Sequence, residues 1–310
     1  MIRPLHPIDV PRYALFGGPG WSSRSYTLDS LLREPRPRLS VMDAARLSLV
    51  SQRKDACAWA VTRGSQVLGI AAARPRSGLG TWEVDQLLLG TDDDPAYLEL
   101  LRKVCQGVAR KGGEKVFIRL PGLDPLVDVA RLCGFVPSDR EHLYVGPQGP
   151  ALYERPSGLR EKGQIDEFDL FRLYNASTPS ETRLLVGVTF DQWRSSRNRS
   201  PRGCHEFVYE RDGVIRGWVR ISRRFGVGQL VSMLHPDADV DVDALIDYGL
   251  SRLSGANIVY CLVSKYQLYL RRLLKQKGYQ DKSEYVTLVK SMVVPARTEE
   301  RGQAVTISPT

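Results

Sequence analysis

The stretch from His235 to Asp243 combines residue types that could do chemistry with a position where many proteins bind phosphate. It follows a strand-like segment, Leu230 to Leu234, and precedes a helix-like run that starts at Ala244, so the predicted order is strand, sharp turn, helix. Glycines in such a turn let the backbone amides of the helix N-terminus approach a phosphate. Here the turn carries four aspartates, which suit a helix N-terminus as caps but repel a phosphate.

A second candidate site is a basic face on the predicted strand from Arg216 to Arg224. Because side chains alternate along a strand, one face carries Arg216, Trp218, Arg220 and Arg224. Such a face could bind nucleic acid, an anionic ligand or an acidic partner protein. The alternative is an ordinary sheet face on which arginine stems, or the other half of the chain, cover Trp218. We favour the alternative.

Composition and charge limit the class of protein. The chain has 310 residues, of which 42% are hydrophobic and 25% charged, enough for two soluble domains. The sequence shows no signal-peptide pattern and no membrane-length apolar run, so we expect a cytoplasmic protein with no membrane partner. Five scattered cysteines and four histidines predict neither a disulfide framework nor a metal site. The net charge of +9 suits solubility and also permits a nucleic acid or acidic partner.

The predicted elements occur in the same order twice. In each half a hairpin glycine is followed, after a nearly equal interval, by a Gly-aromatic pair. These residues are Gly69 with Gly134-Phe135, and Gly217 with Gly278-Tyr279. We therefore predict an N-terminal domain at 1–146, a linker at 147–158, a C-terminal domain at 159–294 and a disordered polar tail at 295–310.

This order of elements resembles the GNAT N-acetyltransferase superfamily, present in tandem over nearly the whole chain. The resemblance rests on Ile2-Arg3-Pro4, the two hairpins ending at Gly69 and Gly217, the His235-Pro236-Asp237-Ala238 turn and the two Gly-aromatic pairs. It implies an α+β (mixed α/β) fold of two GNAT-like domains, each with a mixed, mostly antiparallel twisted sheet flanked by helices. It also implies N-acyl transfer from acetyl-CoA or another acyl-CoA to an amine on a small molecule or peptide.

The resemblance further implies that the end of the fourth strand of each copy, and the turn after it, hold the coenzyme. The matching residues are Leu87, Leu88, Leu89 and Gly90 in the first copy, and Leu234 and His235 in the second. In the family this turn reads approximately Arg/Gln-x-x-Gly-x-Gly/Ala. Here aspartates fill it in both copies, as Asp92-Asp93-Asp94 and as the acidic run after Pro236. Since carboxylates oppose a diphosphate, we expect one copy or both to be catalytically degenerate.

The catalytic residues of the family are only partly matched. Family members often carry a tyrosine, the general acid, four residues before the closing glycine, where this chain has Ala130 and Leu274. Tyr266 and Tyr269 lie near the second of these positions and could replace it, although ordinary surface or core tyrosines are commoner than catalytic ones.

A general base in this family would be an acid on the central strand. Glu83 and Asp85 of the first copy are two residues apart and therefore share one strand face. The second copy has Val231 and Met233 at these positions, so the sequence places any chemistry in the N-terminal copy.

Two other functions stay open. One is a non-enzymatic binding or scaffold protein that uses its cleft or the basic strand face. The other is transfer from a donor other than coenzyme A, such as an aminoacyl-tRNA.

Overall fold

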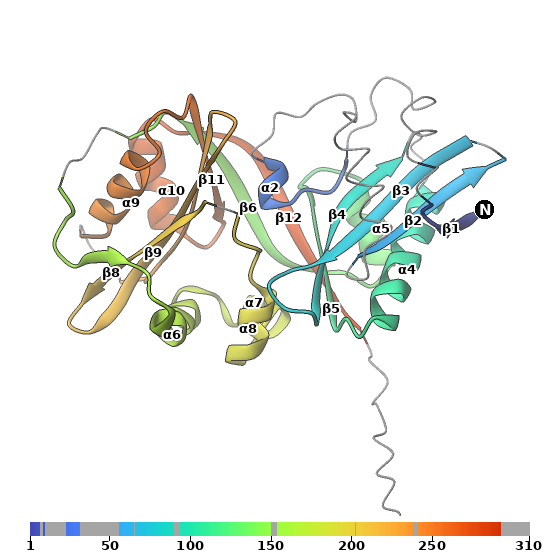
Figure 1. The fold of residues 1–310 in the computed structure, drawn as a ribbon, viewed down its shortest axis with the longest axis horizontal. Helices are drawn as coiled ribbons and strands as arrows, with labels where there is room; N and C mark the ends of the chain where they lie inside the picture. The colour runs from blue at the N-terminus through green and yellow to red at the C-terminus, as the bar shows by residue number, and fades with distance from the viewer. Residues whose placement is uncertain are drawn as a thin grey trace, which may run out of the picture.

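The computed structural model describes residues 1–6, 9, 23–31, 56–64, 66–89, 94–149, 154–201, 203–237 and 241–292. Over these residues the chain forms one twelve-stranded sheet flanked by helices (Figure 1). The first half contains β1 (Ile2–Pro4), α2 (Leu28–Leu31), β2 (Cys57–Arg63), β3 (Gln66–Pro75), β4 (Thr81–Leu89), α4 (Asp94–Arg110), β5 (Lys115–Pro121), α5 (Leu126–Leu132) and β6 (Val136–Gly146).

The second half repeats this order. It contains β7 (Leu159–Glu161), a 3-10 turn (Gln164–Asp166), α6 (Glu167–Ser177), α7 (Ser180–Val186), α8 (Phe190–Ser196), β8 (His205–Arg211), β9 (Val214–Arg224), β10 (Val227–Leu234), α9 (Asp241–Ser251), β11 (Ile258–Ser264), α10 (Leu268–Gln276) and β12 (Gln280–Ser291). The repeated hairpins and helices predicted from the sequence are present. The helices predicted at 11–16 and 39–49 lie outside the described residues.

One predicted helix, from 179 to 194, is divided into α7 and α8. The division falls at Gly187, where an added Cβ would lie 2.7 Å from the backbone nitrogen of Trp193. The Thr189 hydroxyl then accepts a hydrogen bond from the backbone N–H of Gln192 and caps α8. The backbone of Gly187 is extended, with φ 168° and ψ 124°, so α7 ends there and α8 begins as a separate helix after Thr189.

The two halves exchange their last strands. The strand order is β1-β2-β3-β4-β5-β12-β6-β11-β10-β9-β8-β7. Thus β12, from the end of the chain, pairs with β5, and β6 pairs with β11. The exchanged strands β6 and β12 also pair with each other, antiparallel, at the centre of the sheet (Figure 1). Each half therefore completes its sheet with a strand from the other half.

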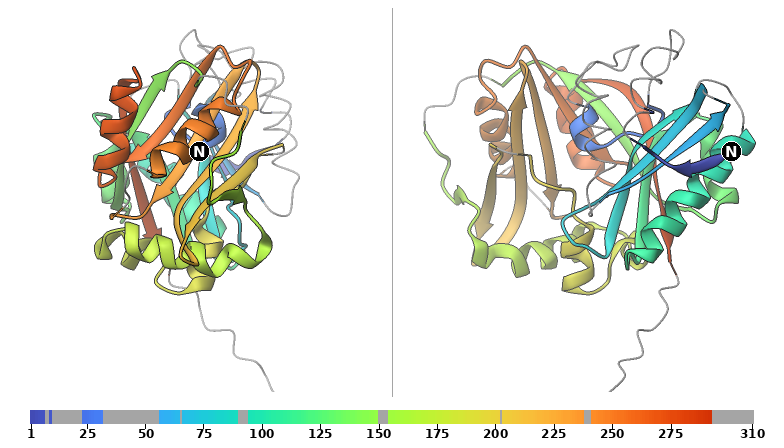
Figure 2. Two further views of the ribbon diagram at one scale, coloured as in Figure 1. Left: turned by 90° about the vertical axis from the view of Figure 1, so that its left-hand side faces the viewer. Right: turned by 45° about the vertical axis from the view of Figure 1, so that its right-hand side comes forward.

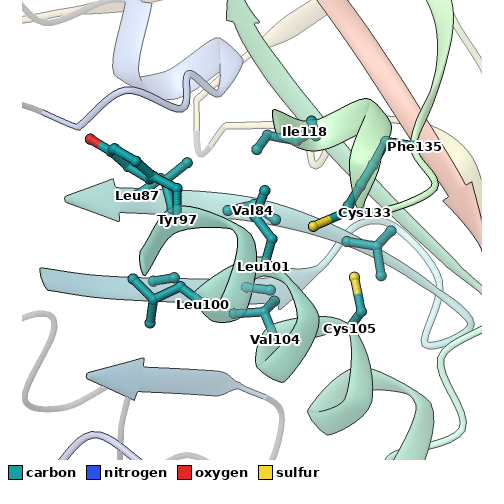
Figure 3. Close-up of a cluster of buried hydrophobic side chains, with 14 of the residues drawn as sticks. Val84, Leu87, Tyr97, Leu100, Leu101, Val104, Cys105, Ile118, Cys133 and Phe135 are labelled. Atoms are coloured by element: carbon teal, nitrogen blue, oxygen red, sulfur yellow. The ribbon is translucent and has the colours of Figure 1, made fainter. Parts of the chain in front are cut away.

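Each half has its own apolar core, and the exchanged strands contribute to both. In the first half, α4 starts with Pro95 at its first turn and turns Leu100, Leu101 and Val104 toward β2 and β3 (Figure 3). Val286 and Leu288 of β12 are buried in this same core. The second core includes Tyr144 of β6 and the apolar sides of α9 and α10.

The opposite face of the sheet is covered where the two halves meet. There α7 contacts β6 and β12, and α8 contacts β4 (Figures 1 and 2). Lys115 of β5 donates to the carbonyls of Leu185 and Val186 at the end of α7, at 2.9 and 3.0 Å. Arg76, directly after β3, donates to the carbonyl of Ser196 at the end of α8. Cations at helix C-termini are favourable, so these contacts fix α7 and α8 on the sheet of the first half.

The described part of the chain contains neither a membrane-spanning helix nor a cluster of metal-binding side chains. No helix there is both long and apolar enough to cross a membrane. Nor do three or more His, Cys, Asp or Glu side chains gather there as a metal site would require. The cysteines are free, and burial raises the pKa of Cys57 and Cys133. They are packing residues in the first core rather than reactive thiols.

Candidate functional site

The crevice between β4 and β5 in the first half is filled by the chain itself. The two strands pair only from Thr81 to Glu83, and then diverge. Beyond that point the backbone N–H of Arg24 donates to the Leu87 carbonyl at 2.9 Å, and the Leu87 N–H donates to the Ser23 hydroxyl at 3.1 Å. On the other side, Tyr26 N–H donates to a β5 carbonyl, that of Arg119, at 2.9 Å. The segment 23–26 thus occupies the main-chain groups that an inserted ligand would use.

This segment is held at both ends. The Arg24 guanidinium donates two hydrogen bonds to Asp124, at 2.8 and 2.9 Å. Further along, Leu28 and Leu31 of α2 are buried against β6, β11 and β12. The Gln229 side chain of β10 donates to the Leu28 carbonyl at 2.9 Å. We call residues 23–31 the clasp, because they connect the crevice of the first half to the sheet of the second.

The corresponding crevice in the second half is less filled. Strands β10 and β11 pair from Val227 to Leu230 and then diverge. Beyond this point the Gln267 side chain donates to the Ser232 carbonyl at 3.4 Å. The Ser232 hydroxyl is buried and has no hydrogen-bond partner among the described residues. One side chain, rather than a chain segment, spans this crevice.

The predicted coenzyme residues do not present a built site for a diphosphate. Leu87, Leu88 and Leu234 are buried in apolar cores, and Gly90 lies outside the described residues, as does the Leu89 side chain. At the second turn the His235 backbone N–H donates to the Arg216 carbonyl. The Nδ1 atom of the His235 ring accepts a hydrogen bond from the backbone N–H of Asp237. At the start of α9, Asp243 accepts a hydrogen bond of 2.6 Å from the Tyr269 hydroxyl. A carboxylate stands where a phosphate would need N–H donors.

The acidic pair predicted on the central strand is bound to arginines. Glu83 and Asp85 both face Arg74, at 2.8 and 3.7 Å. Glu83 also lies 3.6 Å from Arg76. The β3–β4 pairing contains a bulge in which Asp85 is the extra residue. Burial raises the pKa of Asp85 to about 7. The two acids share one face as expected, but they serve a buried ion-pair network.

This network continues across the exchanged strands. Arg119 of β5 reaches over β12 to Glu141 of β6 with two hydrogen bonds, of 2.7 and 3.1 Å. The Thr287 hydroxyl of β12 donates to the same carboxylate at 2.5 Å. Burial alone would raise the pKa of Glu141, but Arg119 and Thr287 hold it below its usual value. Glu141 is therefore a fixed negative charge at the junction.

A cavity of about 440 Å³ lies at the end of this network. It is lined by Pro137, Ser138, Asp139 and Arg140 of β6, Thr182 of α7, and Lys265, Tyr266 and Leu268 after β11. The strand exchange creates it, because β6 comes from the first half and the other elements from the second. The Thr182 hydroxyl donates to the Ser138 carbonyl at 2.8 Å and closes one side.

Asp139 is the notable group in this cavity. Its carboxylate accepts a hydrogen bond of 2.5 Å from the Ser264 hydroxyl, and it forms no ion pair within the described part of the chain. Burial and the nearby charge of Glu141 raise its pKa to about 8, although the Ser264 hydrogen bond and the charge of Arg119 act in the opposite direction. A half-buried carboxylate that titrates near neutral pH in a cavity is a candidate functional group.

The two predicted tyrosines occupy different places. Tyr266 lines the cavity with Asp139, and burial raises its pKa to about 12, so it stays protonated at neutral pH. Tyr269 instead contacts Asp243 across α9 and α10. Neither is in contact with Glu83 or Asp85, which face the arginines of β3. The predicted catalytic set is therefore not one site.

The basic strand face is not an exposed patch. Trp218 and Arg220 are only 7% and 4% exposed, because α6 packs on β9. The indole N–H of Trp218 donates to Glu206, and the guanidinium groups of Arg197 and Arg220 lie over its ring. Arg216 is half-buried beside His235, and only Arg224, at the end of the strand, is exposed. The central residues of this face are therefore covered, and arginine side chains lie over the Trp218 ring, as in the alternative that we favour.

Comparison with solved structures identifies this architecture. A GCN5-related N-acetyltransferase from Sphaerobacter thermophilus aligns with 94% of this chain and 95% of its own, with a TM-score of 0.57 and 15% identity. The chain therefore has the fold of the GNAT acetyltransferases. It carries this fold in tandem, since a tandem GNAT protein of the clavulanic acid biosynthesis pathway aligns over 94% of this chain and 98% of its own, with a TM-score of 0.51 and 13% identity.

Sequence comparison alone finds no such relative. No protein-family model matches the chain, and no curated protein matches it. At identities of 13–15% the structural similarity establishes the fold and not the activity. The function must therefore be argued from the site.

Proposed function

We propose that this chain is an amine-binding protein built on a tandem GNAT fold, with Asp139 as the group that pairs with the ammonium. The observation that carries this proposal is a half-buried carboxylate that lines a cavity and has no ion-pair partner among the described residues. Its one side-chain hydrogen bond comes from the neutral Ser264 hydroxyl. A partly desolvated charge without a counter-ion is costly, and a cationic ligand offsets that cost. Pro137, Leu268 and the Tyr266 ring supply an apolar wall for the body of such a ligand.

Amine binding is expected to depend on pH and on the charge of Asp139. An ammonium pairs with the ionised carboxylate, so affinity should rise as pH increases toward the pKa of about 8. An alkylamine stays protonated in this range, and so does Tyr266, which leaves Asp139 as the carboxyl group of the cavity whose charge changes. Between pH 6 and pH 8 we expect the affinity for isoamylamine, measured by calorimetry, to rise at least about tenfold.

The same calorimetric titration with isoamylamine, carried out on a variant, tests the role of Asp139. Asp139→Asn keeps the shape of the side chain but removes its charge, and should weaken isoamylamine binding by about tenfold or more at pH 8 and abolish the pH dependence. Asp128→Asn is the matched control, because Asp128 is an exposed residue of α5. Equal affinity in wild type and Asp139→Asn would contradict the proposal.

Acetyl-CoA is the donor that the tandem GNAT fold suggests, and we expect no binding of it. The clasp occupies the first crevice, and carboxylates occupy the helix terminus at the second turn. Calorimetric titration with acetyl-CoA up to about 1 mM should give no heat of binding, since several kcal/mol of phosphate contacts are missing. Saturable binding below this concentration would instead favour an acyltransferase.

A second candidate function is N-acyl transfer in the second half, from a donor other than coenzyme A. The specific observation is that Tyr266, a protonated phenol, lies beside Asp139, which could accept the proton of an attacking amine. Incubating an amine with an aminoacyl-tRNA and the protein, then measuring the mass of the amine, separates this function from binding alone. Transfer that Tyr266→Phe reduces, with amine binding intact, would establish it.

A further inference from the structure

The cavity at the junction carries a second charge that forms no ion pair with a described residue. Lys265 follows Ser264, the residue that donates to Asp139, and the Lys265 backbone N–H donates to the Arg140 carbonyl at 2.6 Å. The exposed Lys265 side chain lines the cavity, and its charge acts on Glu284 without a direct ion pair. The other cation of the cavity, Arg140, is the one that pairs with Glu284, at 2.7 Å. One carboxyl group and one ammonium group of the cavity are therefore outside ion pairs.

These two charges do not neutralise each other. Asp139 is half-buried, and its Oδ2 atom is held by the Ser264 hydroxyl at 2.5 Å. Lys265 is exposed, and no ion pair joins it to Asp139, although it directly follows Ser264 in the chain. A ligand with a single charge could use only one of them and would be repelled by the other. A ligand that carries both charges could use both.

We propose that the cavity binds a zwitterion, an α-amino acid or the end of a short peptide. This inference rests on the proposed amine-binding function and specifies its ligand. Asp139 pairs with the ammonium and Lys265 with the carboxylate. The apolar wall of Pro137, Leu268 and Tyr266 contacts an apolar side chain. The less exposed position of Asp139 makes the ammonium contact the stronger of the two, because water screens the exposed Lys265.

Three probes with the same branched body separate the charges. Leucine carries both charges, isoamylamine only the ammonium, and isocaproate only the carboxylate. Titrated by calorimetry into the full chain at pH 8, leucine should bind about fivefold more tightly than isoamylamine, and isocaproate should bind weakest of the three. Lys265→Gln should remove the advantage of leucine over isoamylamine without weakening isoamylamine. Because Lys265 is exposed, this variant should keep the fold, which thermal unfolding verifies.

Lys103→Gln is the matched control. Lys103 lies on α4 of the first half, beside Glu99 at 3.8 Å, and its replacement should leave all three affinities unchanged. Equal affinity for leucine and isoamylamine, or a leucine affinity unaffected by Lys265→Gln, would overturn the zwitterion while the amine-binding function stands. Failure of both leucine and isoamylamine to bind would overturn the proposed function and this inference together.

Discussion

Replacing Arg119 with methionine is expected to lower the free energy of unfolding by about 3–5 kcal/mol, the usual cost of leaving one charge of a buried pair uncompensated. Arg119 is 4% exposed, and both of its hydrogen bonds to Glu141 cross β12, the strand exchanged from the other half. Methionine fills a similar volume, so the loss comes from the stranded Glu141 carboxylate rather than from a cavity. Urea denaturation of wild type and variant measures the difference.

An exposed pair of the same type provides the comparison. Arg131 pairs with Asp128 on the surface of α5, and Arg131→Met should change the free energy of unfolding by less than about 1 kcal/mol. The Arg119→Met, Glu141→Leu double variant should recover much of the lost stability, because it removes both charges. If Arg119→Met unfolds at the same urea concentration as wild type, the buried pair contributes nothing and the network is incidental.

Leu288→Ala, near the end of the chain, is expected to destabilise the beginning of the chain. Leu288 lies on β12 and is fully buried in the core that α4 and β5 form in the first half. Removing a buried leucine leaves a cavity, and the cost in such cores is about 2–5 kcal/mol. Urea denaturation measures the total effect, and hydrogen exchange followed by mass spectrometry locates it.

The location is the decisive part of this experiment. Amides of α4 and β5 should exchange faster in Leu288→Ala, whereas those of α9 and β9 should change less, because they belong to the second core. Val214→Ala is the control, since Val214 is half-exposed at the start of β9 and should cost less than about 1 kcal/mol. Faster exchange confined to the second half would show that β12 stabilises its own half.

The sequence predicts the elements and the tandem GNAT fold because both depend on local patterns. Alternation in Val116, Ile118 and Leu120, or the helical spacing in α4, can be recognised from a short stretch. The exchange of β6 and β12 cannot, since both strands carry apolar residues that suit either neighbour. Which strand pairs with β5 and which with β11 depends on contacts between residues that are far apart in the sequence. The sequence predicts the last strand of each half only at 142–145 and 285–289. In the folded sheet these strands extend over 136–146 and 280–291, because they pair with each other as well as with β5 and β11.

The candidate site shows a similar limit. The sequence singles out Glu83 and Asp85, which are paired with arginines that come close only in the folded sheet. It misses Asp139, because the charged run Asp139-Arg140-Glu141 has the composition of a turn and not of a strand interior. Tyr266, which the sequence singles out as a replacement general acid, lines a cavity whose carboxyl group, that of Asp139, comes from the other half of the chain. The clasp has no periodicity that would predict its place in a crevice.

The exchanged strands also affect how the chain folds during its synthesis. The sheet of the first half is closed by β12, which ends at Ser291, so this half cannot complete its core until synthesis has passed residue 291. At 5–20 residues per second, the delay after β6 is roughly seven to thirty seconds. During this time the edge of β5 that pairs with β12 in the folded chain lacks that partner and is open to strands of other nascent chains. Synthesis is therefore the stage at which the first half is most open to wrong strand pairing.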